Sequence, residues 1–415
     1  GATTAGTGTD YLKYGVGYYK ESGCTNQITA SANAITVPAR TGYTFGGYYK
    51  ETGATNQILT DAGKLSSSAS TTAYTANATI YAKWTKAVSS LTNSVSPTSY
   101  IYDGNAKSPT PTSKDGSTTL TNNTDYSVAF TNNTNVGNAT ATFTGKNVYN
   151  STTKAYYTGT ATVTYAINNA KLTFNVSSNG GTISGTSPLY IRKGQTGVYT
   201  GIQNSTAGTI PTATKTGHTF TGWWTAASGG SKVIDPTSGI IANITDWTDS
   251  NKKWLRTADS TLYAQFSANV YTITFETGSG SEVSPITGRY EAPVERPEDP
   301  SRTWYQFSGW SPEFPSTMPL SWVTLIAEWT ANTGTKYQVN HRGENTWWTA
   351  YDVLLSGYLM YGTSDTQTLA ESKTFSGFTL SGWVTQKNIE SDGSTVIDIY
   401  YSRNVYTITF ETGIS

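Results

Sequence analysis

The sequence is poor in the residues that most often carry chemistry. It has one cysteine, Cys24, which cannot form an internal disulfide, and only two histidines, His218 and His341. Charged residues make up 13% of the chain, and 27 Lys and Arg balance 27 Asp and Glu. Because a chain without net charge holds neither nucleic acid nor an anionic membrane surface by bulk electrostatics, we expect no nucleic-acid partner.

Long apolar runs are also missing. No stretch reaches the roughly 18 apolar residues of a membrane-spanning helix, so we expect no membrane insertion in this segment. No basic-then-apolar stretch opens the chain, so a signal or an anchor would lie outside it. A single cysteine in a long chain rich in Thr, Asn and Tyr is typical of an exported bacterial protein without a disulfide framework.

Residues that favour strands and turns are abundant. The 415 residues include 29 Tyr, 12 Trp and 40 Gly, whereas Met occurs only twice. Tyr, Trp and Thr favour strands, and Gly and Asn favour turns. The composition therefore predicts a nearly all-β chain, and its length predicts three to five separate cores.

Internal repeats are the strongest pattern. The stretch "GYYKESGCTNQI" at 17–28 returns as "GYYKETGATNQI" at 47–58, with Ala54 in the place of Cys24. The thiol is therefore not required by the repeated local structure. The echo indicates a strand end and turn written twice by local duplication.

Three kinds of segment recur over the whole chain. An aromatic–glycine motif, a closing strand and an opening strand can each be aligned between copies. The aromatic–glycine motifs are "GYTFGGYY" at 42–49, "GHTFTGWW" at 217–224, "WYQFSGWS" at 304–311 and "SGFTLSGW" at 376–383. The closing strands are "NATIYAKW" at 77–84, "DSTLYAQF" at 259–266 and "WVTLIAEW" at 322–329. The opening strand "VYTITFETG" occurs at 270–278 and again at 405–413, with "KLTFNVSSNGG" at 171–181 as a looser relative.

Period-two alternation predicts which side chains of these strands are buried. Each closing strand places three apolar residues on one face: Ile80, Ala82 and Trp84; Leu262, Ala264 and Phe266; Leu325, Ala327 and Trp329. In the aromatic–glycine motifs two rings lie three residues apart, as in Phe45 and Tyr48, and would face opposite sides of a regular strand. We therefore predict a β-bulge at the intervening glycine, at Gly47, Gly222 and Gly309, that returns both rings to one core.

These elements predict six consecutive parts. The boundaries are 1–86, 87–168, 169–267, 268–331, 332–403 and 404–415. Residues 11–19 would be the opening strand of the first module, 87–168 a small β-sandwich, and 404–415 the opening strand of a further module. Because this last strand stops with the sequence, we expect the chain to be part of a longer protein.

The repeated segments resemble known families. "TGYTFGGYY" with "NATIYAKW", "TGHTFTGWW" with "DSTLYAQF", and the whole of 268–331 resemble Listeria–Bacteroides repeats, the internalin B-repeat family of bacterial surface proteins. Residues 332–403 are similar to mucin-binding-protein-like repeats, and 91–168 resemble a bacterial Ig-like module. The resemblance implies a mainly β rod, in which β-grasp-like modules and one Ig-like β-sandwich follow one another as beads on a string.

Candidate catalytic and metal-binding groups are few. The histidines lie in different modules, which argues against a metal site or a Ser–His–Asp triad. In "DWTDSNKKW" at 246–254, Asp246, Asp249 and Asn251 form a weak calcium candidate, but the spacing and final Glu of an EF-hand are missing. A solvated turn is the simpler interpretation. We therefore predict no enzyme, no cofactor and no catalytic residue.

The function predicted is mechanical. We expect a non-catalytic stalk or spacer of a large adhesin-like protein on the outside of a bacterial cell. One alternative is a segment of an extracellular filament that self-associates into fibres. Another is a module that binds a protein or glycan of a host or neighbouring cell through Trp347, Trp348 and Tyr351 in "NTWWTAYD", a stretch with no counterpart in the other modules.

Overall fold

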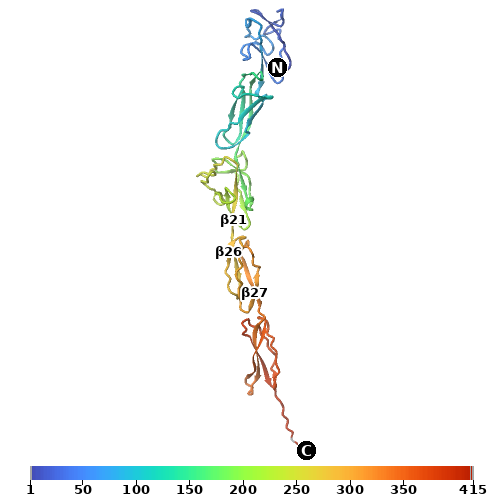
Figure 1. Cartoon of the computed structure of the whole chain (residues 1–415), viewed down its shortest axis with the longest axis vertical. Coiled ribbons are helices and arrows are strands. Elements are labelled where there is room, and N and C mark those ends of the chain that lie inside the picture. Colours follow the sequence, from blue (N-terminus) through green and yellow to red (C-terminus); the bar gives the residue numbers. More distant parts are fainter. Residues whose placement is uncertain (1, 412, 414–415) are drawn as a thin grey trace. The chain divides into compact units, whose positions relative to one another are not determined.

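A computed structural model of the chain describes residues 2–411 and residue 413 (Figure 1). Nearly all of its regular structure is β, as the composition predicts, and strands occur in every part of the chain. Within the described residues, helical structure consists of two single turns of 3₁₀ helix, η1 (Val88–Ser90) and η2 (Ser177–Asn179), and no helix could cross a membrane.

The chain divides into two compact units. The first unit comprises the residues up to Thr214 together with Phe220–Gln265. The second comprises Lys215–Thr219 together with the residues from Phe266 onwards. Each unit contains several small sheets, and the chain folds as a mainly β tandem array.

The first 86 residues form two small sheets in the first unit. Their strands are β1 (Tyr11–Lys13), β2 (Gly17–Tyr19), β3 (Gln27–Ile28), β4 (Thr44–Tyr49), β5 (Gln57–Leu59) and β6 (Tyr81–Ala87). The expected single strand over 11–19 is wrong, because β1 and β2 form a hairpin that turns at Gly15 with φ of 71°. That hairpin joins β3 in a sheet of its own and does not pair with β6.

The duplicated stretch forms the same loop twice. In each copy a glutamate, Glu21 or Glu51, accepts hydrogen bonds from the backbone amides of the Thr and Asn that follow it. Cys24 and Ala54 occupy matching positions, each with φ of 52°. The two copies are therefore one glutamate-capped hairpin loop used at β2–β3 and at β4–β5.

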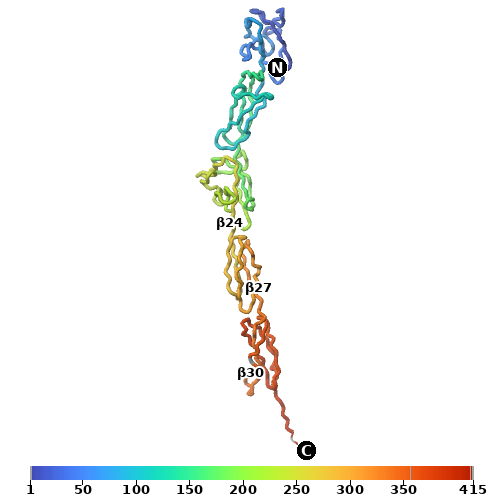
Figure 2. Tube along the Cα trace, in the orientation of Figure 1, coloured from blue at the N-terminus to red at the C-terminus, as the bar shows by residue number. Residues whose placement is uncertain are grey.

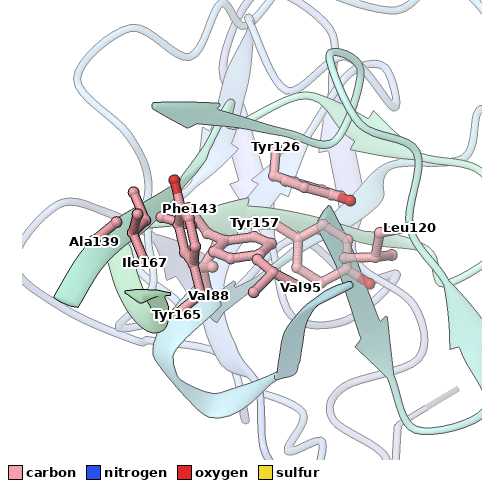
Figure 3. Packing of buried hydrophobic residues seen from close by; sticks show 10 residues of the cluster. Val88, Val95, Leu120, Tyr126, Ala139, Phe143, Tyr157, Tyr165 and Ile167 are labelled. Carbon is pink, nitrogen blue, oxygen red and sulfur yellow. The ribbon is translucent and has the colours of Figure 1, made fainter. Parts of the chain in front are cut away.

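Residues 87–168 form two sheets that share one core. The strands are β7 (Thr92–Ser96), β8 (Ser99–Ile101), β9 (Thr110–Asp115), β10 (Thr118–Thr119), β11 (Tyr126–Thr131), β12 (Gly137–Gly145), β13 (Tyr149–Asn150), β14 (Ala155–Thr158) and β15 (Thr160–Asn168). The sheet β10-β9-β7 and the sheet β11-β12-β15-β8 both contribute to a cluster that includes Val95, Phe143 and Tyr157 (Figure 3). The remaining pair, β13–β14, belongs to a different sheet, in the order β13-β14-β6-β4-β5.

The last part of the first unit is built around a seven-stranded sheet in the order β19-β18-β16-β24-β21-β22-β23. Its strands and those of the small sheet β17-β20 are β16 (Ala170–Asn175), β17 (Thr182–Ser184), β18 (Leu189–Ile191), β19 (Val198–Tyr199), β20 (Thr212–Thr214), β21 (His218–Trp224), β22 (Lys232–Asp235), β23 (Gly239–Ile240) and β24 (Ser260–Ala268). Leu262 and Ala264 of β24 are fully buried, as the alternation predicts.

The second unit contains two four-stranded sheets, ordered β26-β25-β28-β27 and β30-β29-β32-β31. The strands are β25 (Val270–Glu276), β26 (Ile286–Arg289), β27 (Tyr305–Ser311), β28 (Val323–Ala331), β29 (Thr335–Glu344), β30 (Tyr351–Gly362), β31 (Phe378–Leu380) and β32 (Val396–Arg403). The β27 and β30 segments are marked along the trace in Figure 2. Ile273, Leu325 and Ala327 are buried on the predicted faces.

The predicted bulge is present in the motifs of β4 and β27, and the motif of β21 has a similar backbone conformation at its glycine. The strand register shifts at this point in β4 and β27, and Gly47, Gly222 and Gly309 have φ of 104°, 126° and 151°. The ring pairs Phe45–Tyr48, Phe220–Trp223 and Phe307–Trp310 lie 5.2, 5.3 and 5.1 Å apart in edge-on contact. Both rings of each pair therefore reach the same core.

The stretch from residue 404 onwards differs from its prediction. Residues 405–411 repeat the sequence of β25, yet residues 404–411 form no strand and Val405, Tyr406, Ile408 and Phe410 are exposed. In β25 the same sequence is hydrogen-bonded on both sides, by β26 and β28. A strand needs such partners, and no strand of the described residues pairs with 404–411. The expected strand extends to 415, and residues 412 and 414–415 lie outside the described residues.

Candidate functional sites

The tip of the β29–β30 hairpin carries the predicted binding residues. The side-chain Oδ1 of Asn345 accepts hydrogen bonds from the amides of Trp347 and Thr349, both at 3.1 Å, and its own amide donates to the carbonyl of Ala350. This ordered turn leaves Trp347 81% exposed and Trp348 63% exposed. Tyr351, 41% exposed, lies 4.8 Å from the ring of Tyr400.

The hairpin therefore presents large apolar rings to solvent. Strand β30 is also an edge strand, and its Tyr358, Leu359 and Tyr361 are exposed along it. Exposed aromatic patches of this kind mark surfaces that stack on planar or saccharide rings or that meet another protein.

The exposure of Trp383 was not predicted, because the motif at 376–383 places it among the aromatic residues expected in a core. It ends the fourth aromatic–glycine motif, at the position that Trp223 and Trp310 occupy in the others. Trp223 and Trp310 are buried, but β31 stops at Leu380 and Trp383 is 84% exposed. The signal that could have found it is the change of Phe to Leu380, which removes the first ring of the pair.

The calcium candidate is organised as a turn. Asp249 Oδ1 accepts hydrogen bonds from the amides of Asn251 and Lys253, both at 2.8 Å. Asp246 has φ of 63°, typical of a turn residue. Among the described residues, no group of three His, Cys, Asp or Glu side chains could hold a metal ion.

The two histidines have structural surroundings. The Nδ1 of His218 lies 2.8 Å from the carbonyl of Thr216, and its ring meets Tyr290 edge-on. His341 is fully buried, with Nδ1 2.9 Å from the hydroxyl of Tyr401. Burial, and then the charge of Lys373, lower the pKa of His341, so that it is a neutral core residue.

A buried polar cluster that the sequence did not reveal lies around Asp115. Its carboxylate forms an ion pair of 2.6 Å with Lys86 Nζ and accepts hydrogen bonds from the hydroxyls of Tyr43 and Tyr157. Burial alone would raise the pKa of Asp115, but the bonds from Lys86, Tyr43 and Tyr157 lower it below its ordinary value. The guanidinium of Arg40 stacks on the ring of Tyr43, 3.6 Å from its centroid.

An asparagine begins each of the short connections that follow β15 and β28. Asn169 is buried between β15 and β16. Its backbone amide donates a hydrogen bond to the carbonyl of Ile202, and its side-chain Oδ1 accepts one from Arg192 Nε at 2.9 Å. Asn332 follows β28, and its amide donates to Trp304 O at 2.9 Å.

In the second unit, Asn269 and Asn404 repeat one arrangement. The amide of each donates to a glycine carbonyl, of Gly217 or Gly377. The Oδ1 of each asparagine accepts a hydrogen bond from the threonine two residues after that glycine. Thr219 donates to Asn269 at 2.6 Å, and Thr379 donates to Asn404 at 2.5 Å. These connections are therefore held by specific hydrogen bonds.

Comparison with known proteins agrees with the repeat structure. Residues 14–83, 171–246 and 271–318 match the Listeria-Bacteroides repeat domain. Internalin H of Listeria monocytogenes serovar 1/2a is 32% identical over 192 residues, which are 41% of this chain and 32% of that protein. A protein of Evansella cellulosilytica, provisionally named a Gly-rich membrane protein, is 25% identical over 218 residues, 48% of this chain and 23% of its own.

These matches support a bacterial surface repeat protein. The chain spans about a third of the internalin and about a quarter of the Evansella protein. The second and third matched segments begin at the opening strands β16 and β25, whereas the first begins at Tyr14, in the turn of the β1–β2 hairpin. The first repeat therefore departs from the others where its opening strand is expected.

Proposed function

We propose that the chain is a non-catalytic stalk or spacer of a large adhesin-like protein outside a bacterial cell. One observation carries this proposal: in three consecutive segments the first and last strands are parallel neighbours in the sheet. These pairs are β16 with β24, β25 with β28, and β29 with β32. The repeat matches and the internalin relative support the cell-surface setting.

Parallel terminal strands resist pulling because of their geometry. When two strands run parallel, the start of the first and the end of the last lie at opposite ends of the pair. Tension on the chain then shears all hydrogen bonds between the strands together instead of opening them one at a time. In the second unit, for example, four residue pairs from Ile273↔Val323 to Glu276↔Ile326 share this load.

The connections favour the same function. Between β15 and β16 a single residue, Asn169, intervenes, and Asn332 begins the short stretch between β28 and β29. Flexible linkers are rich in Gly and Ser and leave their ends free, whereas these asparagines are hydrogen-bonded. Each segment keeps its own core, so tension is borne in series.

Single-molecule force spectroscopy of the whole chain tests the proposal. We expect separate unfolding events, and the segment from β25 to β28 should release about 200 Å, from about 60 residues at about 3.6 Å each. Thr274→Pro, in β25 between β26 and β28, should remove or weaken that event. The matched control is Thr287→Pro in the edge strand β26. Extension without discrete force peaks would contradict the stalk function.

A second candidate function is binding of a protein or glycan by the tip of the β29–β30 hairpin. The observation that favours it is the exposure of Trp347 and Trp348 on an ordered turn. Arrays of glycans and of extracellular-matrix proteins should show a ligand that is lost in the double variant Trp347→Ala/Trp348→Ala. Trp322→Ala, which removes a ring that is 79% exposed elsewhere, should keep it. Absence of any ligand, or equal loss in both variants, would exclude this function.

A further inference from the structure

The place beside the closing strand is filled differently in the first repeat. In the three later segments the closing strand lies between a strand that carries the aromatic–glycine motif and a parallel opening strand. The opening strand in turn pairs antiparallel with a hairpin partner: β16 with β18, β25 with β26, and β29 with β30. This arrangement is therefore constant in the array.

The first repeat differs from this arrangement. Strand β14 pairs with Thr85–Ala87, beyond the closing motif at 77–84, whereas β16 and β25 pair with residues 260–263 and 323–326 inside theirs. The closing strand β6 of the first repeat pairs with β4, which carries the aromatic–glycine motif, and on its other side with β14, in parallel. The register is Tyr156↔Thr85, Tyr157↔Lys86 and Thr158↔Ala87. Strand β14 also pairs antiparallel with β13, so 149–158 is a hairpin at the edge of β6, in which the strand next to β6 comes second. These residues come after the sandwich strand β12 in sequence.

We propose that the hairpin 149–158 joins the sandwich to the first repeat by adding to the edge of β6, so that residues 2–168 fold as one cooperative unit. The surface that accepts it is the edge of β6, and the partner that fits this edge is an extended, parallel strand with a large side chain on each face. Within residues 2–86, the β1–β2 hairpin belongs to a separate sheet and does not pair with β6.

The side chains of β14 face two cores at once. Tyr157 is fully buried within the sandwich cluster, where Figure 3 shows it among Phe143, Val95 and their neighbours. Tyr156, 3% exposed, faces the other way, and its hydroxyl donates to the carbonyl of Thr52 in the loop between β4 and β5. The strand therefore cannot leave β6 without uncovering an aromatic residue that closes the first repeat.

Polar contacts hold the same junction from both sides. Arg40 donates to the carbonyls of Thr153 and Lys154, in the turn of the 149–158 hairpin, at 2.8 and 3.3 Å. The Asp115 carboxylate, on sandwich strand β9, forms an ion pair with Lys86 of β6 and accepts a hydrogen bond from the hydroxyl of Tyr157 of β14. Two domains that merely touch would not need a shared sheet and a shared buried charge.

Hydrogen exchange of the full chain, measured by mass spectrometry, tests the proposal. Phe143→Ala removes a fully buried ring of the sandwich core that lies outside the first repeat. If the unit is cooperative, amides of β4 and β6 should exchange faster by about the same factor as those of β11 and β12, more than about 100-fold. Leu325→Ala, an equally buried residue in β28, is the matched control and should leave β4 and β6 unchanged.

A substitution in the first repeat provides an independent test, in case the Phe143→Ala variant does not fold. Trp84→Ala, in β6 of the first repeat, should speed exchange in β14 and in the sandwich strands that pack on Tyr157. Faster exchange confined to the mutated segment in both variants would overturn the proposal, because it would show two independent domains. That result would leave the force experiment on β25 and β28 unaffected, so the two proposals fail separately.

Discussion

Replacing Asp115 by alanine tests the buried cluster most directly. The carboxylate side chain is 4% exposed and that of its partner Lys86 is 15% exposed, so the pair is largely shielded from water. Asp115→Ala would leave the ammonium of Lys86 without its counter-ion and the hydroxyl of Tyr43 without its acceptor. Tyr157 could still donate to the hydroxyl of Thr153, 2.8 Å away.

The magnitude follows from which groups stay buried. Breaking a buried ion pair by removing one partner costs about 3–5 kcal/mol, because the other charge is left uncompensated. Lys86 keeps some contact with water, so the lower end of that range, about 3 kcal/mol, is expected. A loss of this size raises the rate of hydrogen exchange through opening by about 150-fold.

The assay is exchange at amides of β6, β9 and β14 in the full chain. Asp299→Ala is the control, because its pair with Arg296 has side chains that are 56% and 52% exposed. An exposed pair contributes less than about 1 kcal/mol, so this variant should change local exchange by only a few-fold. Equal behaviour of the two variants would refute the reasoning that Asp115 holds this junction together.

Three further perturbations follow from the structure. Because the pKa of buried His341 is lowered, stability of residues 332–403 should be complete above the unfolded pKa of about 6.5 and fall as the pH drops below it. Exchange of β29 amides at pH 7.5 and 5.0 measures this, and His341→Gln should abolish the difference. The side-chain hydrogen bond from Thr55, followed by backbone bonds, lowers the pKa of Glu51 to about 2. The loop contacts should therefore be complete above the ordinary value of 4.5 and disappear only as the pH falls through about 2. NMR titration of the Thr55 and Asn56 amides should show this transition, and Glu51→Gln should remove it. A Cβ at Gly47 would lie 2.4 Å from the carbonyl oxygen of Leu59, whereas at Gly309 it would meet no atom within 4 Å. Gly309→Ala should cost about 1–3 kcal/mol from backbone strain alone, and Gly47→Ala more; equal losses in chemical denaturation would contradict the steric argument.

Features set by neighbours in sequence were predictable. Alternation correctly placed Leu262, Ala264 and Leu325 in cores, because a strand with one wet face fixes the direction of every second side chain. The three-residue spacing of paired rings correctly predicted the bulges at Gly47 and Gly309, since only a bulge returns both rings to one side.

Features set by partners distant in sequence were not predictable. Residues 11–19 alternate like an opening strand, but the pattern does not show that Gly15 turns the chain back on itself. Residues 405–411 repeat β25 letter for letter and still form no strand, because pairing depends on β26-like and β28-like neighbours. Asp115 carries no motif, and its role arises only when the fold brings Tyr43, just before β4, together with Lys86 of β6 and Tyr157 of β14.

The candidate binding tip was found in sequence for a reason that the fold explains. "NTWWTAYD" has no counterpart in the other repeats, since a residue that serves the common core must recur in every copy. Trp347 and Trp348 lie in a turn beyond the sheet, where no core requires them. By contrast Trp383 occupies a position shared with core residues, so only the three-dimensional structure separates it from them.

Two buried polar groups of the chain lie where segments meet. Asn169 is almost fully buried at one connection, and Asp115 lies where the sandwich meets the first repeat. Buried polar groups cost free energy unless they are hydrogen-bonded, so residues kept at such places specify one geometry more than they add stability. A binding module needs its polar groups at an accessible surface, whereas a spacer needs them at its connections. Asn169 and Asp115 therefore fit a spacer, whereas the exposed rings at the tip of the β29–β30 hairpin are a surface that a spacer alone does not explain.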